Sequence, residues 1–164
     1  MMPDACYINI GSNQGDRRAN IARAVALIAD RLDTTPLVSD AVESEPWGYS
    51  SDAAYLNVGL LVHVDMSPAI LLDTLLDIQH AISPAPHRKP DGTYADRIID
   101  IDLIACGQTV ADDILTPAGN RLTLPHPRMH LRPFVLIPML RLSPQWRHPL
   151  SGLTPAGMLD ALEH

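Results

Sequence analysis

The 164-residue chain is 46% hydrophobic and carries a formal net charge of −7. This length and composition predict one globular domain with a core of ordinary size. The acidic balance and the single lysine argue against a general nucleic-acid binder, which would present a basic stripe. No stretch approaches the roughly 20 apolar residues of a membrane-spanning helix.

The hydrophobic pattern predicts strands and helices in alternation. Apolar residues at helical spacing, after capping residues or a proline, predict the helices, and weakly alternating or β-branched runs predict the strands. The expected elements are a strand at 6–10, a helix at about 18–32, strands at 37–43 and 55–64, a helix from Pro68, a strand at 98–105, a short strand or extended segment at 122–127, a helix from 127 or 132 to 140, and a last helix at 155–162.

The order strand–helix–strand–strand–helix–strand is that of the ferredoxin-like split unit. We therefore expect an α+β fold in which helices flank an antiparallel sheet, in three α/β/α layers. Residues 162–164 resemble the stump of an expression tag, so a single domain over residues 1–161 is expected.

The most informative segment is 96–104, an apolar strand with a carboxylate at alternate positions. Asp100 and Asp102 point to the same face of such a strand, roughly 6–7 Å apart along it. The alternative is a polar face that is only solvated, which fits one aspartate better than two beside Arg97. Mg²⁺ binds through one or two carboxylates plus substrate phosphates, so the spacing indicates a magnesium–nucleotide site.

Arginines cluster in the segments that flank this pair, and their planar guanidinium groups match phosphates. His126 stands between two prolines that fix its backbone, and both His126 and Arg132 are candidates to face a phosphate. A helix entry whose polar groups only cap backbone donors is an equally good interpretation of this segment.

Aromatic residues are scarce, at 4% of the chain. Trp47, Tyr55 and Phe134 are candidates to stack on a flat heterocycle, and Asn57 offers both a donor and an acceptor to its edge. For any single aromatic, a place in the core is the simpler explanation.

Together these motifs resemble the 6-hydroxymethyl-7,8-dihydropterin pyrophosphokinase family. The likeness extends over nearly the whole chain. It rests on the segments Tyr7–Asn13, Ser44–Gly48, Tyr55–Asn57, Arg97–Leu103, Leu124–His126 and Arg132–Phe134.

The resemblance implies that the chain transfers the β,γ-pyrophosphoryl group of ATP to the hydroxymethyl group of the pterin, releasing AMP, in folate biosynthesis. Two Mg²⁺ ions held by Asp100 and Asp102 are the implied cofactors, with ATP as co-substrate. Arg97 and Arg88 are the other implied catalytic residues. The implied ATP-binding residues are Arg97, Arg121, Thr123, His126 and Arg132, and the implied pterin-binding residues are Ser44, Pro46, Trp47, Tyr55, Asn57 and Phe134.

The chain departs from the family pattern before Arg97, where Thr93 replaces an expected cation and Asp96 adds a negative charge. His87, Arg88 and Lys89 are the only cationic or imidazole side chains of the loop over residues 84–94, which is expected to be a lid over the site or else an ordinary surface loop. In the second helix, Gln79 stands where the family commonly has a glutamate.

Two other functions are alternatives that the sequence leaves open. One is a different magnesium-dependent kinase or nucleotidyltransferase on the same scaffold, and the other is a ligand-binding module without chemistry. We expect small-molecule substrates, no nucleic-acid or membrane partner, and a monomer. Cys6 and Cys106 lie in apolar segments and are expected to be buried thiols, which with the lack of a signal sequence favours the cytoplasm.

Overall fold

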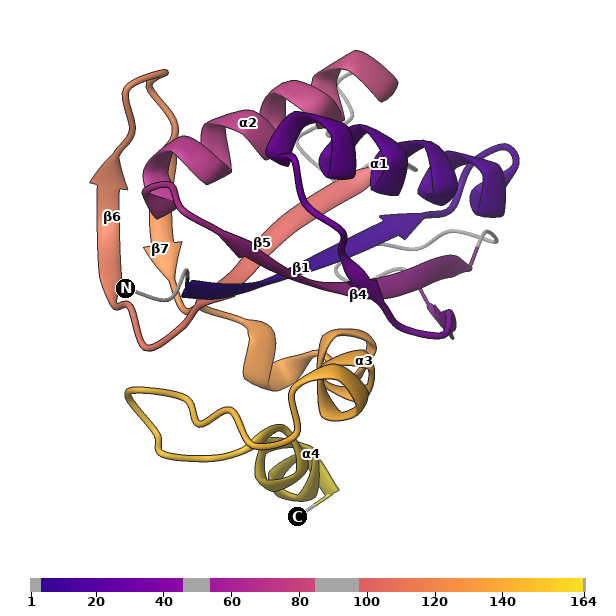
Figure 1. Cartoon of the computed structure of the whole chain (residues 1–164). Coiled ribbons are helices and arrows are strands. Elements are labelled where there is room, and N and C mark those ends of the chain that lie inside the picture. The colour runs from indigo at the N-terminus through magenta and orange to yellow at the C-terminus, as the bar shows by residue number, and fades with distance from the viewer. Residues whose placement is uncertain (1–3, 46–53, 85–97, 164) are drawn as a thin grey trace, which may run out of the picture.

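The computed structural model describes residues 4–45, 54–84 and 98–163. Within these ranges, strands and helices follow one another much as expected (Figure 1). The strands are β1 (Asp4–Ser12), β2 (Leu37–Val38), β3 (Val42–Ser44), β4 (Tyr55–Val64), β5 (Asp100–Cys106), β6 (Ala111–Leu115) and β7 (Arg121–Leu124). The helices are α1 (Arg17–Leu32), α2 (Pro68–Ile82), the 3₁₀ turn η1 (Met129–Leu131), α3 (Pro133–Leu142) and α4 (Pro155–Glu163).

The main sheet has the strand order β2–β4–β1–β5, and β3 also pairs with β4. Every pairing in it is antiparallel. A separate hairpin is formed by β6 and β7. This strand order, with α1 after β1 and α2 after β4, confirms the predicted ferredoxin-like α+β architecture.

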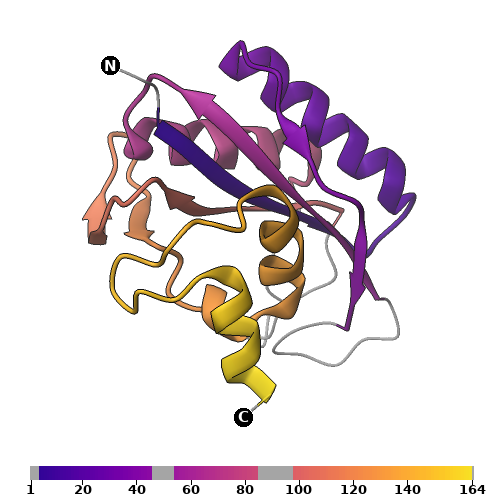
Figure 2. The ribbon, with the colours of Figure 1, turned by 60° about the horizontal axis from the view of Figure 1, so that its bottom comes forward.

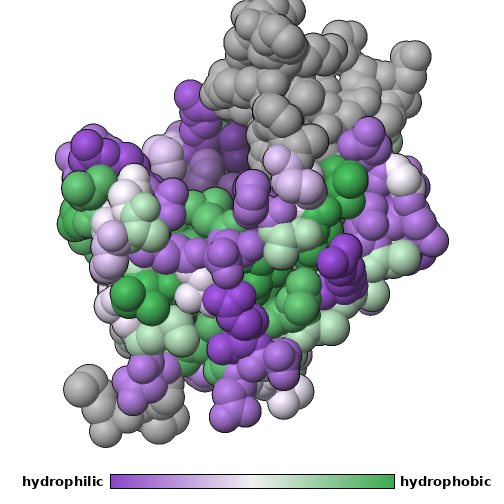
Figure 3. All heavy atoms as spheres, turned by 90° about the horizontal axis from the view of Figure 1, so that it is seen from above, coloured by the Kyte–Doolittle hydropathy of each residue, from purple (hydrophilic) through white to green (hydrophobic). Residues whose placement is uncertain are grey.

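Helices cover both faces of the sheet, α1 and α2 on one side and α3 with α4 on the other (Figures 1 and 2). Alternation along the central strand β1 sorts its side chains between these layers. Ile8 and Ile10 belong to the larger core cluster, which includes residues of α1 and α2, whereas Tyr7 packs with Val135 and Leu136 of α3. Viewed from above, hydrophilic and hydrophobic residues are interspersed on the outer surface (Figure 3).

Local capping explains where the first two helices begin. Asp16 accepts a hydrogen bond from the Ala19 N–H, and Ser67 accepts one from the Ile70 N–H. Each cap satisfies a backbone donor that has no partner inside its helix. Pro68 follows Ser67 directly, at a position where a missing N–H costs nothing.

Three sequence-based expectations differ from the structure. The strand expected at 37–43 is two short strands, because Ser39 between them bonds to Gly59 of β4 through both its backbone and its hydroxyl. The helix expected from 127 or 132 is η1 followed by α3, which begins at Pro133. Strand β6 was missed, because its two aspartates mask the strand pattern and Asp113 has a positive φ.

Helix α2 holds the β6–β7 hairpin through one carboxylate. Asp73 accepts hydrogen bonds from the Thr116 hydroxyl at 2.5 Å, the Ala118 N–H at 3.0 Å and the Asn120 amide at 2.8 Å. The hydrogen bonds from Thr116 and Asn120 lower the pKa of Asp73. The turn that precedes β7 is therefore fixed to the main body of the fold.

The helices in the described part of the chain are all too short or too polar to cross a membrane.

The close packing of β4 against β1 and α3 gives a stability prediction at Gly59. A Cβ atom there would collide with the Tyr7 hydroxyl and lie 3.0 Å from the Cβ of Pro138. We expect Gly59→Ala to lower the free energy of unfolding by about 1–3 kcal/mol, as overpacked cores do, measured by urea denaturation.

Gly157→Ala is the matched control, because a Cβ at this α4 position meets its nearest neighbours at an ordinary 3.5 Å. It should leave stability unchanged or raise it slightly, since alanine favours a helix. Equal stability of Gly59→Ala and the wild type would contradict the packing argument.

Candidate active site

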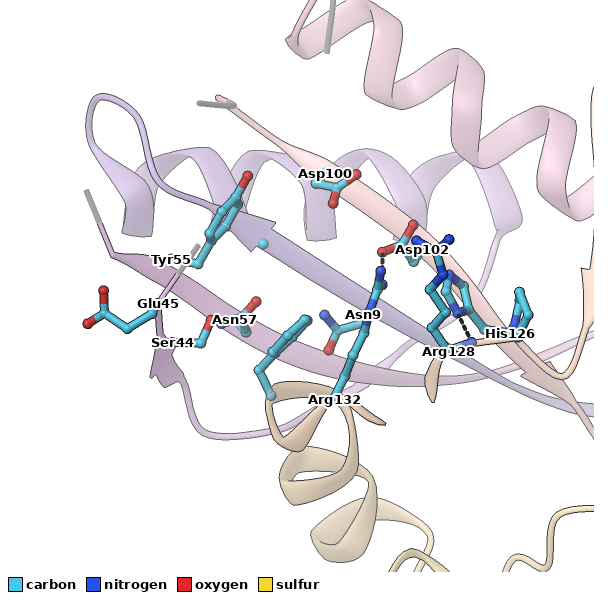
Figure 4. Close-up of a pocket in the computed structure, with 13 residues that line it drawn as sticks. Asn9, Ser44, Glu45, Tyr55, Asn57, Asp100, Asp102, His126, Arg128 and Arg132 are labelled. Atoms are coloured by element: carbon cyan, nitrogen blue, oxygen red, sulfur yellow. Dashed lines mark hydrogen bonds and ion pairs between the residues drawn. The ribbon is translucent and has the colours of Figure 1, made fainter. Parts of the chain in front are cut away.

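A pocket of about 320 Å³ lies where strands β4, β1 and β5 meet the start of α3. Its walls come from segments far apart in the sequence, and the labelled side chains converge on the space between β4 and β5 (Figure 4). It is lined by Asn9, Gly11, Ser44, Glu45, Tyr55, Asn57, Asp100, Asp102, His126, Pro127, Arg128, Arg132 and Phe134.

Strand register sets the floor of this pocket. Gly11 is paired with Asn57 on one side and Asp100 on the other. Two residues earlier in β1, Asn9 is paired with Gly59 and with Asp102. Because directly opposed residues share a face, β1 aligns these polar side chains on the α3 side of the sheet.

The two aspartates therefore stand beside each other on β5, and the intervening Ile101 is buried in the core beneath α1 and α2. The Ile101 N–H donates to Gln79 Oε1 of α2 at 2.8 Å. Arg132 Nη1 lies 3.8 Å from Asp102 Oδ2, and only 13% of the arginine side chain is exposed. The carboxylates are thus held on a fixed backbone and face a largely buried guanidinium.

The opposite end of the pocket suits a flat ring. Tyr55 and Phe134 line it, and the Arg132 guanidinium carbon lies 5.7 Å from the centre of the Phe134 ring. Asn57 Nδ2 donates to the Val42 carbonyl and to Ser44 Oγ.

The hydrogen bonds of Asn57 use its amide nitrogen, so the amide oxygen points toward Gly11, where a Cβ would lie 3.0 Å away. Gly11 thereby leaves room for the Asn57 oxygen and the Tyr55 ring, which lie 3.0 and 3.2 Å from the position of a Cβ there. Both side chains line the pocket, and Asn57 presents an acceptor to it.

His126 enters the pocket from the segment between β7 and η1. Its backbone N–H donates to the Ile104 carbonyl of β5 at 2.7 Å. Burial, together with the charges of Arg132 and Arg128, lowers the pKa of His126 to about 4. The imidazole is neutral at pH 7. Its Nδ1 accepts from the Arg128 N–H at 3.2 Å, which assigns the proton to Nε2.

Eight residues expected at the site from the sequence line this pocket together: Ser44, Tyr55, Asn57, Asp100, Asp102, His126, Arg132 and Phe134. Two do not. Arg121 is exposed, with its Nε 3.9 Å from Asp113, and Thr123 Oγ1 accepts from the Asp113 N–H. Thr123 lines an adjoining, mostly apolar groove of about 680 Å³, which His126 also borders.

Pro46, Trp47, Arg88 and Arg97, together with the rest of the expected lid beyond Pro84, lie outside the described residues.

Sequence reasoning assigned no site role to Asn9, Gly11 or Pro127, which also line the pocket, as do Glu45 and Arg128. The signal for the first two was the alternation of β1, which places them on the face opposite Ile8 and Ile10. Using it required the pairing of β1 with β4 and β5, which the sequence does not state.

The pocket fits a divalent cation shared with a polyphosphate. Among the described residues, no cluster of three or more His, Cys, Asp or Glu side chains forms a closed metal site. Asp100 and Asp102 are a pair of hard oxygen ligands on the pocket wall, which matches an ion that completes its coordination with phosphate oxygens and water.

Comparisons with known proteins agree with this geometry. Residues 7–144 match the model of the 7,8-dihydro-6-hydroxymethylpterin-pyrophosphokinase (HPPK) family. Two relatives are named 2-amino-4-hydroxy-6-hydroxymethyldihydropteridine pyrophosphokinase. The protein from Porphyromonas gingivalis is 32% identical over 143 residues, covering 87% of this chain and 92% of its own. The protein from Mycobacterium bovis is 35% identical over 149 residues, covering 88% and 76%.

A crystal structure described as HPPK-DHPS in complex with substrates has a TM-score of 0.70. The match covers 98% of this chain but 43% of that longer one, at 10% identity. At that identity the likeness supports the fold alone.

The low pKa of His126 predicts a stability change with pH. Between about pH 6.5 and pH 4 the unfolded chain binds a proton at this histidine and the folded chain does not. Stability is therefore full above pH 6.5 and falls as the pH drops toward 4, by up to about 3 kcal/mol. Urea denaturation at several pH values should show a smaller fall for His126→Gln, and identical pH profiles would contradict the assignment.

Proposed function

The chain belongs to the HPPK family, and we propose that its reaction takes place in the pocket bordered by Asp100 and Asp102. It is an ATP-dependent diphosphotransferase of folate biosynthesis, which transfers pyrophosphate from ATP to 6-hydroxymethyl-7,8-dihydropterin. The products are AMP and the pterin diphosphate.

One observation carries the assignment of the site. The same 320 Å³ pocket has a carboxylate pair and a buried arginine at one end, and two aromatic rings with an oriented amide at the other. A flat pterin ring with a hydroxymethyl arm, bound beside the triphosphate of ATP, matches this arrangement of groups along the pocket. A binding module without chemistry would not need the two carboxylates.

In this proposal the pterin stacks between Tyr55 and Phe134, where offset or edge contacts between rings add to burial. Asn57 Oδ1 accepts from an N–H of the ring, because its nitrogen is already engaged by Val42 and Ser44. The ring edge is then fixed, and the hydroxymethyl arm extends toward β5. Pro46 and Trp47 are proposed to complete this wall.

The polyphosphate lies at the β5 end. Arg132 and Arg128 offer guanidinium groups there, and neutral His126 donates its Nε2–H to a phosphate oxygen. Arg97 and Arg88 are proposed to add further positive charge. Arg121 and Thr123 are proposed to contact the nucleotide part of ATP beyond His126, along the groove that Thr123 borders.

The chemistry is attack by the hydroxymethyl oxygen on the β-phosphorus. A new O–P bond forms at the hydroxymethyl oxygen, which loses its proton to solvent water. The bond between the β-phosphorus and the oxygen that bridges it to the α-phosphate breaks, and AMP leaves with the electron pair of that bond. Asp100 and Asp102 are proposed to hold two Mg²⁺ ions, which when bound supply charge neutralisation to the triphosphate. The chain contributes mainly position, because the rigid floor of β1 and β5 fixes both partners.

We propose a cytoplasmic monomer. The support for the compartment is that Cys6 and Cys106 are buried thiols, which stand opposite each other on β1 and β5.

The test combines ATP, Mg²⁺ and the reduced pterin and separates AMP from ADP. We expect AMP with the wild type, and loss of at least a thousandfold in kcat for Asp100→Ala or Asp102→Ala, as expected when a transition-state charge partner is removed. The fold should persist, because removing one carboxylate relieves repulsion in the metal-free protein. Circular dichroism checks the fold.

Asp65→Asn is the control, since Asp65 is exposed and follows the far end of β4. It should retain wild-type turnover. ADP as the product would favour an ordinary kinase, and near-wild-type activity of either β5 variant would overturn the metal assignment.

A further inference from the structure

Asn9 is a buried polar residue that the packing of the fold does not explain. Only 3% of it is exposed, yet its Oδ1 has no hydrogen-bond partner in the described part of the chain. Its side chain lies on the pocket floor, between the labelled groups of Asn57 and Asp102 (Figure 4).

A buried amide oxygen without a hydrogen-bond partner lowers the stability of a fold, because its lost contacts with water are not replaced. The other buried asparagine of the floor, Asn57, bonds to Val42 and Ser44. Two residues before Asn9 in β1, Tyr7 packs in the apolar cluster that includes residues of α3. An apolar residue at position 9 would continue that cluster without cost. The pattern indicates that the Asn9 amide serves a ligand.

The strand register indicates which part of a ligand the Asn9 amide would contact. Asn9 is opposite Asp102 on β5, and directly opposed side chains have Cβ atoms about 5 Å apart. On its other side it is opposite Gly59, where the Tyr7 hydroxyl fills the position of a side chain. The Asn9 amide thus lies on the pocket floor beside the Asp102 carboxylate.

We propose that Asn9 is a substrate-binding residue that hydrogen-bonds the hydroxymethyl-bearing side of the pterin. This inference rests on the proposed function. That side of the ring carries an imine nitrogen, which accepts, next to a hydroxyl, which both donates and accepts. A carboxamide has a donor and an acceptor side by side and can serve both. Asn57 reads one edge of the ring, and Asn9 fixes the arm that reacts.

The test measures binding without turnover. 6-Hydroxymethylpterin, the oxidised ring, is titrated by calorimetry into the protein with Mg²⁺ and a non-hydrolysable ATP analogue. We expect Asn9→Ala to weaken pterin binding about tenfold, which corresponds to ~1.4 kcal/mol. Affinity for the ATP analogue, titrated alone, should stay within about twofold. The melting temperature should not fall, since the variant removes a buried amide oxygen that has no hydrogen-bond partner in the described part of the chain.

Asn9→Leu is the second variant, because it keeps nearly the same volume but excludes a bridging water. It should weaken pterin binding at least as much. Asn120→Ala is the matched control. Its amide is paired with Asp73 away from the pocket, so its loss should lower the melting temperature and leave pterin affinity unchanged.

The outcomes separate the two proposals. A wild-type protein that does not bind the pterin at all would overturn the proposed function. A wild type that binds and turns over normally, with Asn9→Ala and Asn9→Leu binding equally well, would overturn the role of Asn9 alone. Loss of affinity for the ATP analogue, with pterin affinity kept, would also overturn it.

Discussion

Strand alternation on β1 is the constraint from which the rest of the structure follows. A residue in a strand has only two faces available, and β1 is in the middle of the sheet with partners on both sides. Ile8 and Ile10 fill the core toward α1 and α2, so Asn9 and Gly11 must face the other layer. The same alternation on β5 separates Ile101 from the two aspartates. A polar pocket and an apolar core are therefore two sides of one sheet.

The pocket also explains how an acidic chain can handle a polyphosphate. With a net charge of −7, the average field repels anions. The described pocket reverses this locally, because Arg132 is largely buried beside Asp102 and Arg128 stands next to His126. Burial strengthens the charge of Arg132 by removing the screening of water. Burial, together with the charges of Arg132 and Arg128, lowers the pKa of His126, so that its imidazole is neutral and has an Nε2–H to donate.

Much of the fold followed from sequence because its signals are local. The apolar spacing of α1, the proline that opens α2 and the long run of β4 each predict an element without reference to any other. Strand β6 was missed because Asp112 and Asp113 mask its strand pattern. It exists through its pairing with β7, which no local pattern encodes.

The candidate site shows the same contrast between residues that a local pattern predicts and residues that depend on strand pairing. Asp100 and Asp102 were found because their own strand displays them at a spacing of two. Asn9 was missed because its meaning depends on which residues of β4 and β5 stand opposite. Arg121 was expected at the site, and the structure places it beside Asp113 on the hairpin. Where a side chain lies across strands is set by register, which a single sequence leaves open.

Helix α2 has a consequence for how the site tolerates change. β5 is the outermost strand of the main sheet, and Gln79 supplies a partner for the Ile101 N–H on it. Two turns earlier in the same helix, Asp73 secures the hairpin that leads to His126. A small rotation or slide of this one helix would tilt both the strand that carries Asp100 and Asp102 and the segment that carries His126. Substitutions in the buried face of α2 would therefore lower activity by displacing these two segments, although no residue of that face contacts a substrate.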